Sequence, residues 1–188
     1  MIFTLLEIIY LIILVFSVGF IFSGFIKRPV TDPLEKILGN AKRFDWKNIK
    51  YAMAVAAPAV VLHELAHKFT AMAFGLSAEF FIWPTGIVIG VVLKVIGSGF
   101  ILLAPGYVSI FGATQFQSAV TSLAGPFINA VLWGSGFLYI KYKKNIPRKH
   151  AVFISLSSRL NKWLFFFNMI PIPPLDGSKV LMYIIGLF

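Results

Sequence analysis

The sequence has 188 residues, of which 59% are hydrophobic and only 13% carry a charged side chain. Soluble domains average about 25% charged residues, so this composition excludes an ordinary soluble domain and predicts a polytopic membrane protein. The lack of cysteine excludes disulfides, thiolate ligands and a cysteine nucleophile, so any metal must be held by nitrogen and oxygen. The net charge of +10 is concentrated in two short connections, which is typical of loops at a lipid headgroup surface and argues against nucleic acid as a partner.

The first apolar run, residues 2–26, contains a single charged residue, Glu7. A cleaved signal peptide has a basic start and a shorter apolar core, so we interpret 2–26 as a retained membrane span. Glu7 lies near its end, and we expect it in the headgroup region. The basic connection 27–50 follows, in which Asp32 and Pro33 predict the start of a short surface helix.

The second predicted span, 51–75, contains the pattern HExxH at residues 63–67. The run is 25 residues long, enough to cross a bilayer as a helix. The spacing places His63 and His67 on one face, one turn apart, where two imidazoles can hold one zinc ion. Glu64 between them can act as general base towards a zinc-bound water. Ionisable residues at membrane depth are unfavourable and mark functional sites, so three of them in five positions predict a metal centre.

Residues 76–117 are apolar but interrupted by prolines and glycines. Two short strands are predicted at 100–104 and 107–111, on either side of a Pro-Gly turn signal, whereas 87–96 fits either a helix or a strand. An open sheet edge cannot face lipid, so we expect this section to be interfacial or re-entrant. A strand edge beside a hydrolytic centre could also bind an extended peptide by β-addition.

A third span is predicted at 118–140, and it contains the sequence GPFIN at residues 125–129. Its glycines allow another helix to approach closely. Asn129 fits either an interhelical hydrogen bond or a polar group facing an active site, and the sequence leaves both open. The connection 141–150 is the second basic loop, and we assign no role to its His150.

The fourth predicted span, 160–188, is broken, because three prolines within residues 171–174 cannot continue a helix. Broken backbone at membrane depth is tolerated only against protein or a water-filled cavity. Asp176 follows the break, where it could cap the next helix, bind a metal, or do both. The chain has only two carboxylates after His67, Glu79 and Asp176, and Glu79 lies just past the end of the second span. This count favours Asp176 as the third ligand.

Three motifs in this order, HExxH, GPxxN and NxxPxPxLDG, resemble those of the site-2 protease family of intramembrane zinc metalloproteases. The resemblance covers residues from about 51 to 188. The matching positions are His63, Glu64, His67, Gly125, Pro126, Asn129, Asn168, Pro171, Pro173, Leu175, Asp176 and Gly177.

The resemblance implies zinc-dependent hydrolysis of a peptide bond within or next to a transmembrane segment of a membrane-protein substrate, as in regulated intramembrane proteolysis. It implies one zinc ion per chain, bound by His63, His67 and Asp176. Glu64 would be the catalytic residue.

The resemblance further implies that Asn129 lies near the site and that Asn168 helps hold the substrate backbone, so we expect both at the substrate. No stretch is long enough for the inserted PDZ or CBS domain that some relatives carry. We therefore expect a single membrane-embedded metalloprotease domain over residues 1–188. It would be a multi-pass protein of the cell membrane, with membrane lipid and a transmembrane protein substrate as its partners.

The membrane orientation has two competing interpretations. The positive-inside rule places both basic connections, 27–50 and 141–150, in the cytoplasm. This requires 76–117 to return to the face that it entered. The family resemblance implies the reverse, with the HExxH helix entering from outside.

Two other protein classes fit the sequence less well. A CAAX-processing metalloprotease would need a later ExxxD motif, but Glu79 is the only later glutamate and position 83 is Trp83. A non-catalytic metal-binding membrane scaffold or transporter would be expected to lack Glu64 or one of the ligands, and none is missing.

Overall fold

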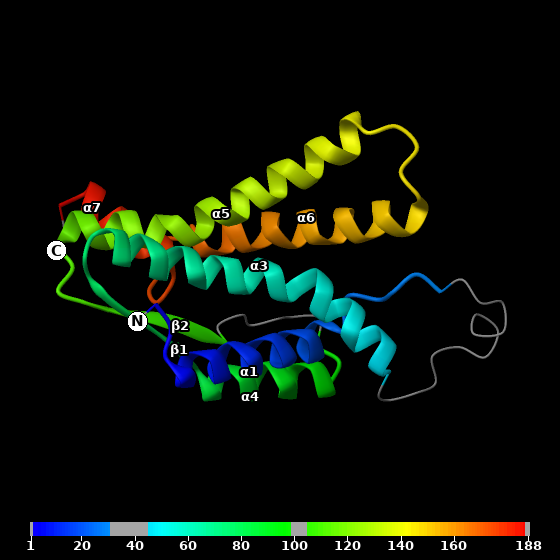
Figure 1. Ribbon diagram of the computed structural model, residues 1–188, viewed down its shortest axis with the longest axis horizontal. Coiled ribbons are helices and arrows are strands. Elements are labelled where there is room, and N and C mark those ends of the chain that lie inside the picture. The colour runs from blue at the N-terminus through cyan, green and yellow to red at the C-terminus, as the bar shows by residue number, and fades with distance from the viewer. Residues whose placement is uncertain (1, 31–44, 99–104, 187–188) are drawn as a thin grey trace.

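The structure is a computed structural model that describes residues 2–30, 45–98 and 105–186. The helices in these ranges are α1 (Leu5–Phe22), α3 (Trp46–Ala73), α4 (Pro84–Val95), α5 (Gln115–Tyr142), α6 (Arg148–Asn168) and α7 (Asp176–Ile184). Strands β1 (Ser77–Ile82) and β2 (Gly106–Phe111) form a two-stranded sheet. In Figure 1, α3 is the central helix, with α1 and α4 on one side and α5 and α6 on the other.

Three of the described helices, α1, α3 and α5, are long and apolar enough to cross a membrane. They correspond to the expected spans 2–26, 51–75 and 118–140. The fourth expected span, 160–188, is not confirmed. Its residues are divided between α6, which carries Arg159 and Lys162, and α7, which has only nine residues.

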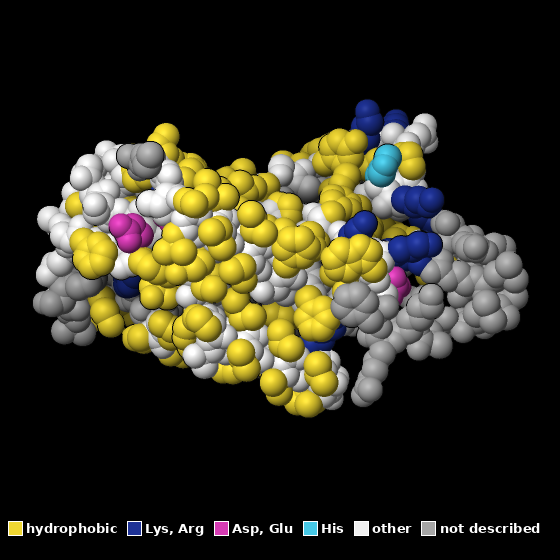
Figure 2. Space-filling view, turned by 60° about the horizontal axis from the view of Figure 1, so that its bottom comes forward, with side chains coloured by type: hydrophobic (Ala, Val, Ile, Leu, Met, Phe, Trp, Pro, Cys, Tyr) yellow, Lys and Arg dark blue, Asp and Glu magenta, His cyan; other side chains and the backbone are white. Residues whose placement is uncertain are grey.

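Many of the side chains on the outside of the described helices are apolar. On α1 alone, Leu5, Ile12 and Phe16 are each at least half exposed. Figure 2 shows hydrophobic side chains across the middle of one face, with most of the lysine and arginine side chains at one end. An apolar surface of this extent, ending in a basic zone, is typical of helices that face lipid.

The described parts of the two basic connections lie at the same end of the molecule. The end of α1 and the start of α3 lie at this end, and so do the end of α5 and the start of α6 (Figure 1). Lys27 and Lys50 flank the first connection, and Lys141 and Lys149 flank the second. The positive-inside interpretation requires both basic connections to lie on one side, and this arrangement meets that requirement.

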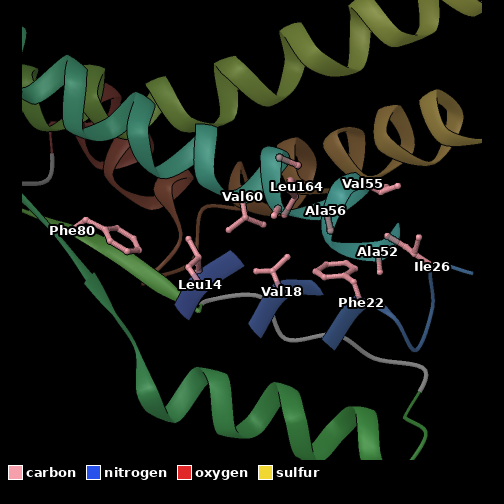
Figure 3. Packing of buried hydrophobic residues seen from close by; sticks show 12 residues of the cluster. Leu14, Val18, Phe22, Ile26, Ala52, Val55, Ala56, Val60, Phe80 and Leu164 are labelled. Atoms are coloured by element: carbon pink, nitrogen blue, oxygen red, sulfur yellow. The ribbon is translucent and has the colours of Figure 1, made fainter. Parts of the chain in front are cut away.

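The hydrophobic core lies mainly between α1 and α3, with contributions from Phe80 of β1 and Leu164 of α6 (Figure 3). Small residues let the two helices approach closely. A Cβ atom built at Gly19 would lie 2.7 Å from the Cβ of Met53, so any larger residue there would push α1 away from α3. This close packing holds α1 against the helix that carries the HExxH pattern.

The two strands pair in antiparallel fashion, with Ser77 opposite Phe111 and Ile82 opposite Gly106. The second strand lies where the sequence predicted it, at 107–111. The expected partner at 100–104 lies outside the described residues, and the observed partner, β1, was not predicted. Alternate β1 side chains are buried against α1 and α3, which holds β1 beside β2. This burial depends on residues far away in the chain, so the local sequence of β1 does not reveal it.

Two further expectations concern local structure. The section 87–96, which fitted either a helix or a strand, lies almost entirely in α4. Pro84 starts that helix at its first turn, where the missing N–H has no intrahelical partner to lose. The surface helix predicted at Asp32 and Pro33 lies outside the described residues.

Candidate active site

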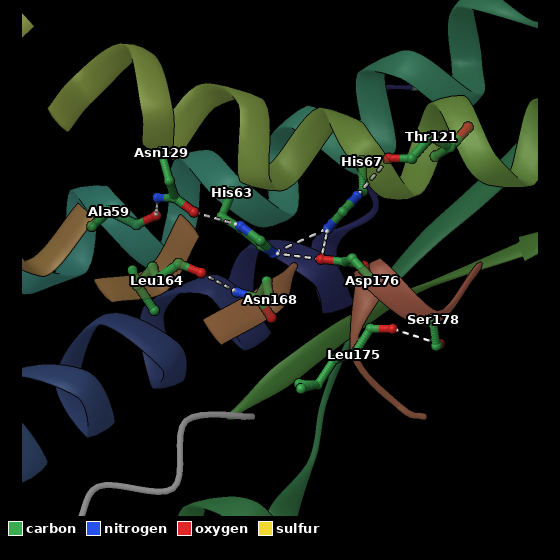
Figure 4. A network of polar contacts seen from close by, with 10 residues as sticks. All are labelled: Ala59, His63, His67, Thr121, Asn129, Leu164, Asn168, Leu175, Asp176 and Ser178. Atoms are coloured by element: carbon green, nitrogen blue, oxygen red, sulfur yellow. Dashed lines mark hydrogen bonds and ion pairs between the residues drawn. The ribbon is translucent and has the colours of Figure 1, made fainter. Parts of the chain in front are cut away.

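Three potential ligand atoms converge between α3 and the start of α7. Nε2 of His63 lies 3.1 Å from Nε2 of His67. Oδ2 of Asp176 lies 3.2 Å from the first nitrogen and 3.3 Å from the second (Figure 4). Both histidines are buried, and one turn of helix separates them as the sequence spacing requires.

This triangle of atoms fits a tetrahedral zinc ion. Zinc–nitrogen and zinc–oxygen bonds of about 2.0–2.2 Å place tetrahedral ligand atoms roughly 3.3–3.6 Å from one another. The three separations between the nitrogen and oxygen atoms, 3.1, 3.2 and 3.3 Å, lie at or slightly below the lower limit of that range. Two imidazoles and one carboxylate are also a frequent donor set for a zinc ion that keeps one position open.

The hydrogen bonds behind the histidines set their tautomers. Nδ1 of His63 lies 2.7 Å from Oδ1 of Asn129, and Nδ1 of His67 lies 2.7 Å from the main-chain oxygen of Thr121. Both partners are carbonyl oxygens, which can only accept, so we assign the ring proton to Nδ1 in each histidine. Each Nε2 then directs a lone pair towards the other two ligand atoms, as a metal ligand must.

Asn129 is held in turn by two further hydrogen bonds. Its Nδ2 donates to the main-chain oxygen of Ala59 at 3.1 Å and to Oδ1 of Asn161 at 2.8 Å. The side chain is fully buried and does not line the cavity described below. In this structure Asn129 therefore orients His63 from behind.

The break between α6 and α7 brings Asp176 to the histidines. The cap residue of α7 is Leu175, and Asp176 is the first residue of the helix. The chain folds back tightly here, since a Cβ atom built at Gly177 would lie 2.4 Å from the main-chain oxygen of Met169. Of the two roles that the sequence left open, the structure places the Asp176 carboxylate with the histidines and gives the cap position to Leu175.

Gly125 brings the backbone of α5 directly onto the two imidazole rings. A Cβ atom at this position would lie 2.4 Å from Nε2 of His67 and 2.7 Å from Cε1 of His63. A side chain at this position would therefore occupy space beside the ligand nitrogens. This contact explains the glycine of the GPxxN motif without any chemical role.

A cavity of about 330 Å³ opens beside the ligand triangle. Glu64 and Asn168 line it together with the three ligand side chains, and β2 forms part of the opposite wall. Glu64 is buried and forms no hydrogen bond with any described residue. Asn168 donates from Nδ2 to the main-chain oxygen of Leu164 in its own helix at 3.1 Å.

Comparison with known proteins identifies the family. No model of a protein family matches the chain, and no solved structure matches it. A protein of Methanocaldococcus jannaschii is 32% identical over 167 residues, which are 85% of this chain and 86% of the relative. A Bacillus subtilis protein is 27% identical over 150 residues (70% of this chain, 67% of the relative). A Synechocystis protein is 29% identical over 128 residues (67% and 29%).

All three relatives bear the name "putative zinc metalloprotease". The chain belongs to this family of zinc metalloproteases. The family implies zinc as the metal, and the described residues of this metalloprotease that could hold one are His63, His67 and Asp176. The site thus combines a donor set suited to zinc with a buried glutamate on the same helix.

The open edge of the sheet faces this metalloprotease site. The main-chain N–H of Trp83 donates to the main-chain oxygen of Pro105, directly opposite, at 2.9 Å. Hydrogen-bonded pairs alternate along an antiparallel ladder, so the bonded pairs of these two strands are those of odd-numbered residues. Main-chain groups alternate in direction along a strand, which points those of Val108 and Ile110 away from β1. We call the antiparallel pair of β1 and β2 the hairpin, although α4 lies in the connection between them. Neither Val108 nor Ile110 has a main-chain partner outside the hairpin among the described residues, and both line the cavity.

The sequence did not predict two of the supporting groups in the metalloprotease. The carbonyl of Thr121 belongs to the main chain, so no residue type signals it. Asn161 lies between the charged residues Arg159 and Lys162 on α6, so its sequence neighbours gave no signal that this amide would be buried and bonded to Asn129.

Proposed function

We propose that this metalloprotease is an intramembrane endopeptidase of the site-2 type, which hydrolyses a peptide bond within or next to a transmembrane segment. One observation carries the proposal. A ligand triangle suited to zinc and a buried glutamate form one wall of a cavity, and another is formed by a strand edge that has no main-chain partner within the described ranges. Three of the described helices, α1, α3 and α5, are long and apolar enough to cross a membrane.

His63, His67 and Asp176 would hold the ion, which when bound supplies a Lewis acid that polarises the scissile carbonyl and acidifies water. Glu64 accepts a proton from the attacking water, whose oxygen bonds to the carbonyl carbon. As the carbon–nitrogen bond breaks, Glu64 returns that proton to the leaving amine. The absence of a competing hydrogen bond among the described residues leaves its carboxylate available for both transfers.

A substrate helix must unwind locally, because its peptide bonds are otherwise enclosed in intrahelical hydrogen bonds. The outward main-chain groups of Val108 and Ile110 can replace those bonds by pairing with the unwound segment. Asn168 lies on the same cavity and is available to the substrate backbone. Asn129 is assigned to the orientation of His63, because its side chain is fully buried behind the ring.

The protease would be a multi-pass protein of the cell membrane, with a transmembrane protein as substrate and lipid around its apolar surface. The basic connections at one end of the molecule support an orientation with that end in the cytoplasm. Labelling of a single cysteine introduced at Lys143 in intact and permeabilised cells tests this orientation, since the chain has no cysteine of its own.

The test of the function uses wild type and Glu64→Gln, purified in detergent or vesicles with a candidate transmembrane substrate. Glutamine is nearly isosteric but cannot accept the proton, so we expect cleavage to fall by about 10²–10⁴-fold while zinc content stays unchanged. Candidate substrates come from comparing the membrane proteomes of cells that express each form. Equal cleavage by both forms would refute the mechanism. Zinc binding without any Glu64-dependent cleavage would favour a scaffold or transporter.

A further inference from the structure

A buried ion pair joins α1 to the HExxH helix at a place that none of the three motifs covers. Glu7 and Lys68 are 4% and 3% exposed, and the ammonium of Lys68 contacts Oε1 of Glu7 directly. Glu7, which we expected in the headgroup region, is thus enclosed by protein, and its depth in the membrane stays a prediction. Its neighbours on α3 and β1 enclose it, and their positions were not visible from the local sequence.

The same two side chains also bind the main chain of β1. Oε1 of Glu7 accepts a hydrogen bond from the N–H of Phe80 at 2.8 Å. Nζ of Lys68 donates to the carbonyl oxygen of Ala78 at 2.8 Å. The second oxygen of Glu7 accepts from the N–H of Thr4 at 2.9 Å, so each carboxylate oxygen has a partner.

These contacts occupy one particular edge of the sheet. Ala78 and Phe80 are even-numbered, so their main-chain groups point away from β2, opposite to the direction of the paired residues. The Glu7 and Lys68 side chains therefore cover the outer edge of β1. None of the described residues bonds to the outer main-chain groups of Val108 and Ile110 on β2, and both residues line the cavity.

The ion pair also relates the hairpin to the metal centre, because Lys68 directly follows His67 on α3. A shift of β1 relative to α3 would break the bond from Lys68 to Ala78. A buried ion pair is a poor source of stability, since well-packed apolar residues can often replace it without loss. Its presence among apolar helices therefore needs another reason.

We propose that Glu7 and Lys68 are positioning residues of the protease. They hold the hairpin at a fixed place beside the metal centre and close the β1 edge, so that an extended substrate can pair only with β2. The first helix is then part of the machinery that presents the substrate. This inference rests on the proposed function for its substrate, but the placement of the hairpin can be measured separately.

The test compares the single variants Glu7→Leu and Lys68→Met with the double variant. Each single variant leaves a buried charge unpaired, so we expect a clear loss of thermal stability. The double variant removes both charges and should recover most of that loss while still lacking the two bonds to β1. The double variant should retain about one zinc ion per chain. Its kcat/KM for a transmembrane substrate should fall about 10- to 100-fold, mainly because KM rises.

A second double variant, Glu7→Gln with Lys68→Met, isolates the hydrogen bond from the charge. It is as neutral as the first double variant, but the glutamine oxygen can still accept from the N–H of Phe80. We expect it to recover part of the lost kcat/KM. Lys50→Met is the matched control, because it removes an exposed lysine from the same helix. It should change neither thermal stability nor kcat/KM.

A physical readout that needs no substrate follows the hairpin itself. Cysteines introduced at Glu79 on β1 and Val131 on α5, both exposed, can carry spin labels without background from native cysteine. The distance distribution between the labels should be narrow in the otherwise wild-type protein. It should broaden when Glu7→Leu and Lys68→Met are added together.

The proposal would be overturned if Glu7→Leu combined with Lys68→Met kept wild-type stability, wild-type kcat/KM and a narrow distance distribution. The ion pair would then be purely structural. A broadened distribution with lowered kcat/KM would support the proposal. If the wild type cleaves no substrate, the proposed function fails. A distribution that still broadens in the double variant would then support the placement of the hairpin by Glu7 and Lys68.

Discussion

The two walls of the cavity are built in different ways. The metal wall has ligands from α3 and α7, and one helix, α5, supports both histidines from behind through the side chain of Asn129 and the main-chain oxygen of Thr121. The hairpin wall consists of two short strands, and Glu7 and Lys68 bind its outer edge. Because separate contacts hold the two walls, chemistry and substrate presentation should be separable by mutation.

Asp176→Ala should have the largest effect on the metal wall. The variant removes one of three ligands and leaves two histidines, so we expect zinc and cleavage to be lost together. Elemental analysis of purified protein measures the zinc content. Glu79→Ala is the matched control, because Glu79 is the only other carboxylate after His67 and is exposed on β1. Full zinc occupancy in Asp176→Ala would exclude Asp176 as a ligand.

Gly125→Ala should damage the same wall without changing a ligand. The added Cβ would lie 2.4 Å from Nε2 of His67, so either α5 or the ring must move. Overpacking of this kind destabilises by about 1–3 kcal/mol, and displaced rings should bind zinc poorly. Thermal unfolding and zinc content measure the two effects. Gly134→Ala on the same helix has open space and should retain full zinc, so equal behaviour of the two variants would contradict the packing argument.

Asn129→Leu should weaken zinc binding more moderately. It removes the acceptor for Nδ1 of His63, and loss of such a supporting group typically lowers metal affinity about 10- to 100-fold. Competition with a chelator measures the affinity, and Ser135→Ala, at an exposed site on α5, is the control. Unchanged zinc affinity with a raised KM would instead place Asn129 at the substrate, as the family resemblance had implied.

Ile110→Pro should give the smallest effect and should leave the metal wall intact. Proline removes the N–H that points away from β1, so the pairing of the two strands keeps its own hydrogen bonds. One lost hydrogen bond to substrate is worth about 0.5–1.5 kcal/mol, which corresponds to a rise in KM of roughly 2- to 12-fold. Ile110→Val retains the N–H and serves as the control. Identical KM values for the two variants would remove the β2 edge from substrate binding.

The parts that sequence reasoning anticipated share a local origin. The spacing of His63 and His67 places them on one helix face whatever the rest of the chain does. Three long apolar runs indicated α1, α3 and α5, because span length and hydropathy are local properties. Asp176 was selected by counting carboxylates, and the structure brings it to the histidines. The fourth span is not confirmed, since polar residues in α6 interrupt the apolar run.

The sequence by itself determined which chemical groups are available and how the helical ones are spaced. Only the tertiary structure decided which strand pairs with β2, which groups support the histidines, and where Glu7 lies. Glu7 meets Lys68 across 61 positions, and Asn129 meets His63 across 66. Helix periodicity repeats every few residues and is visible in any short window, whereas a strand edge or a buried ion pair exists only after distant segments have packed.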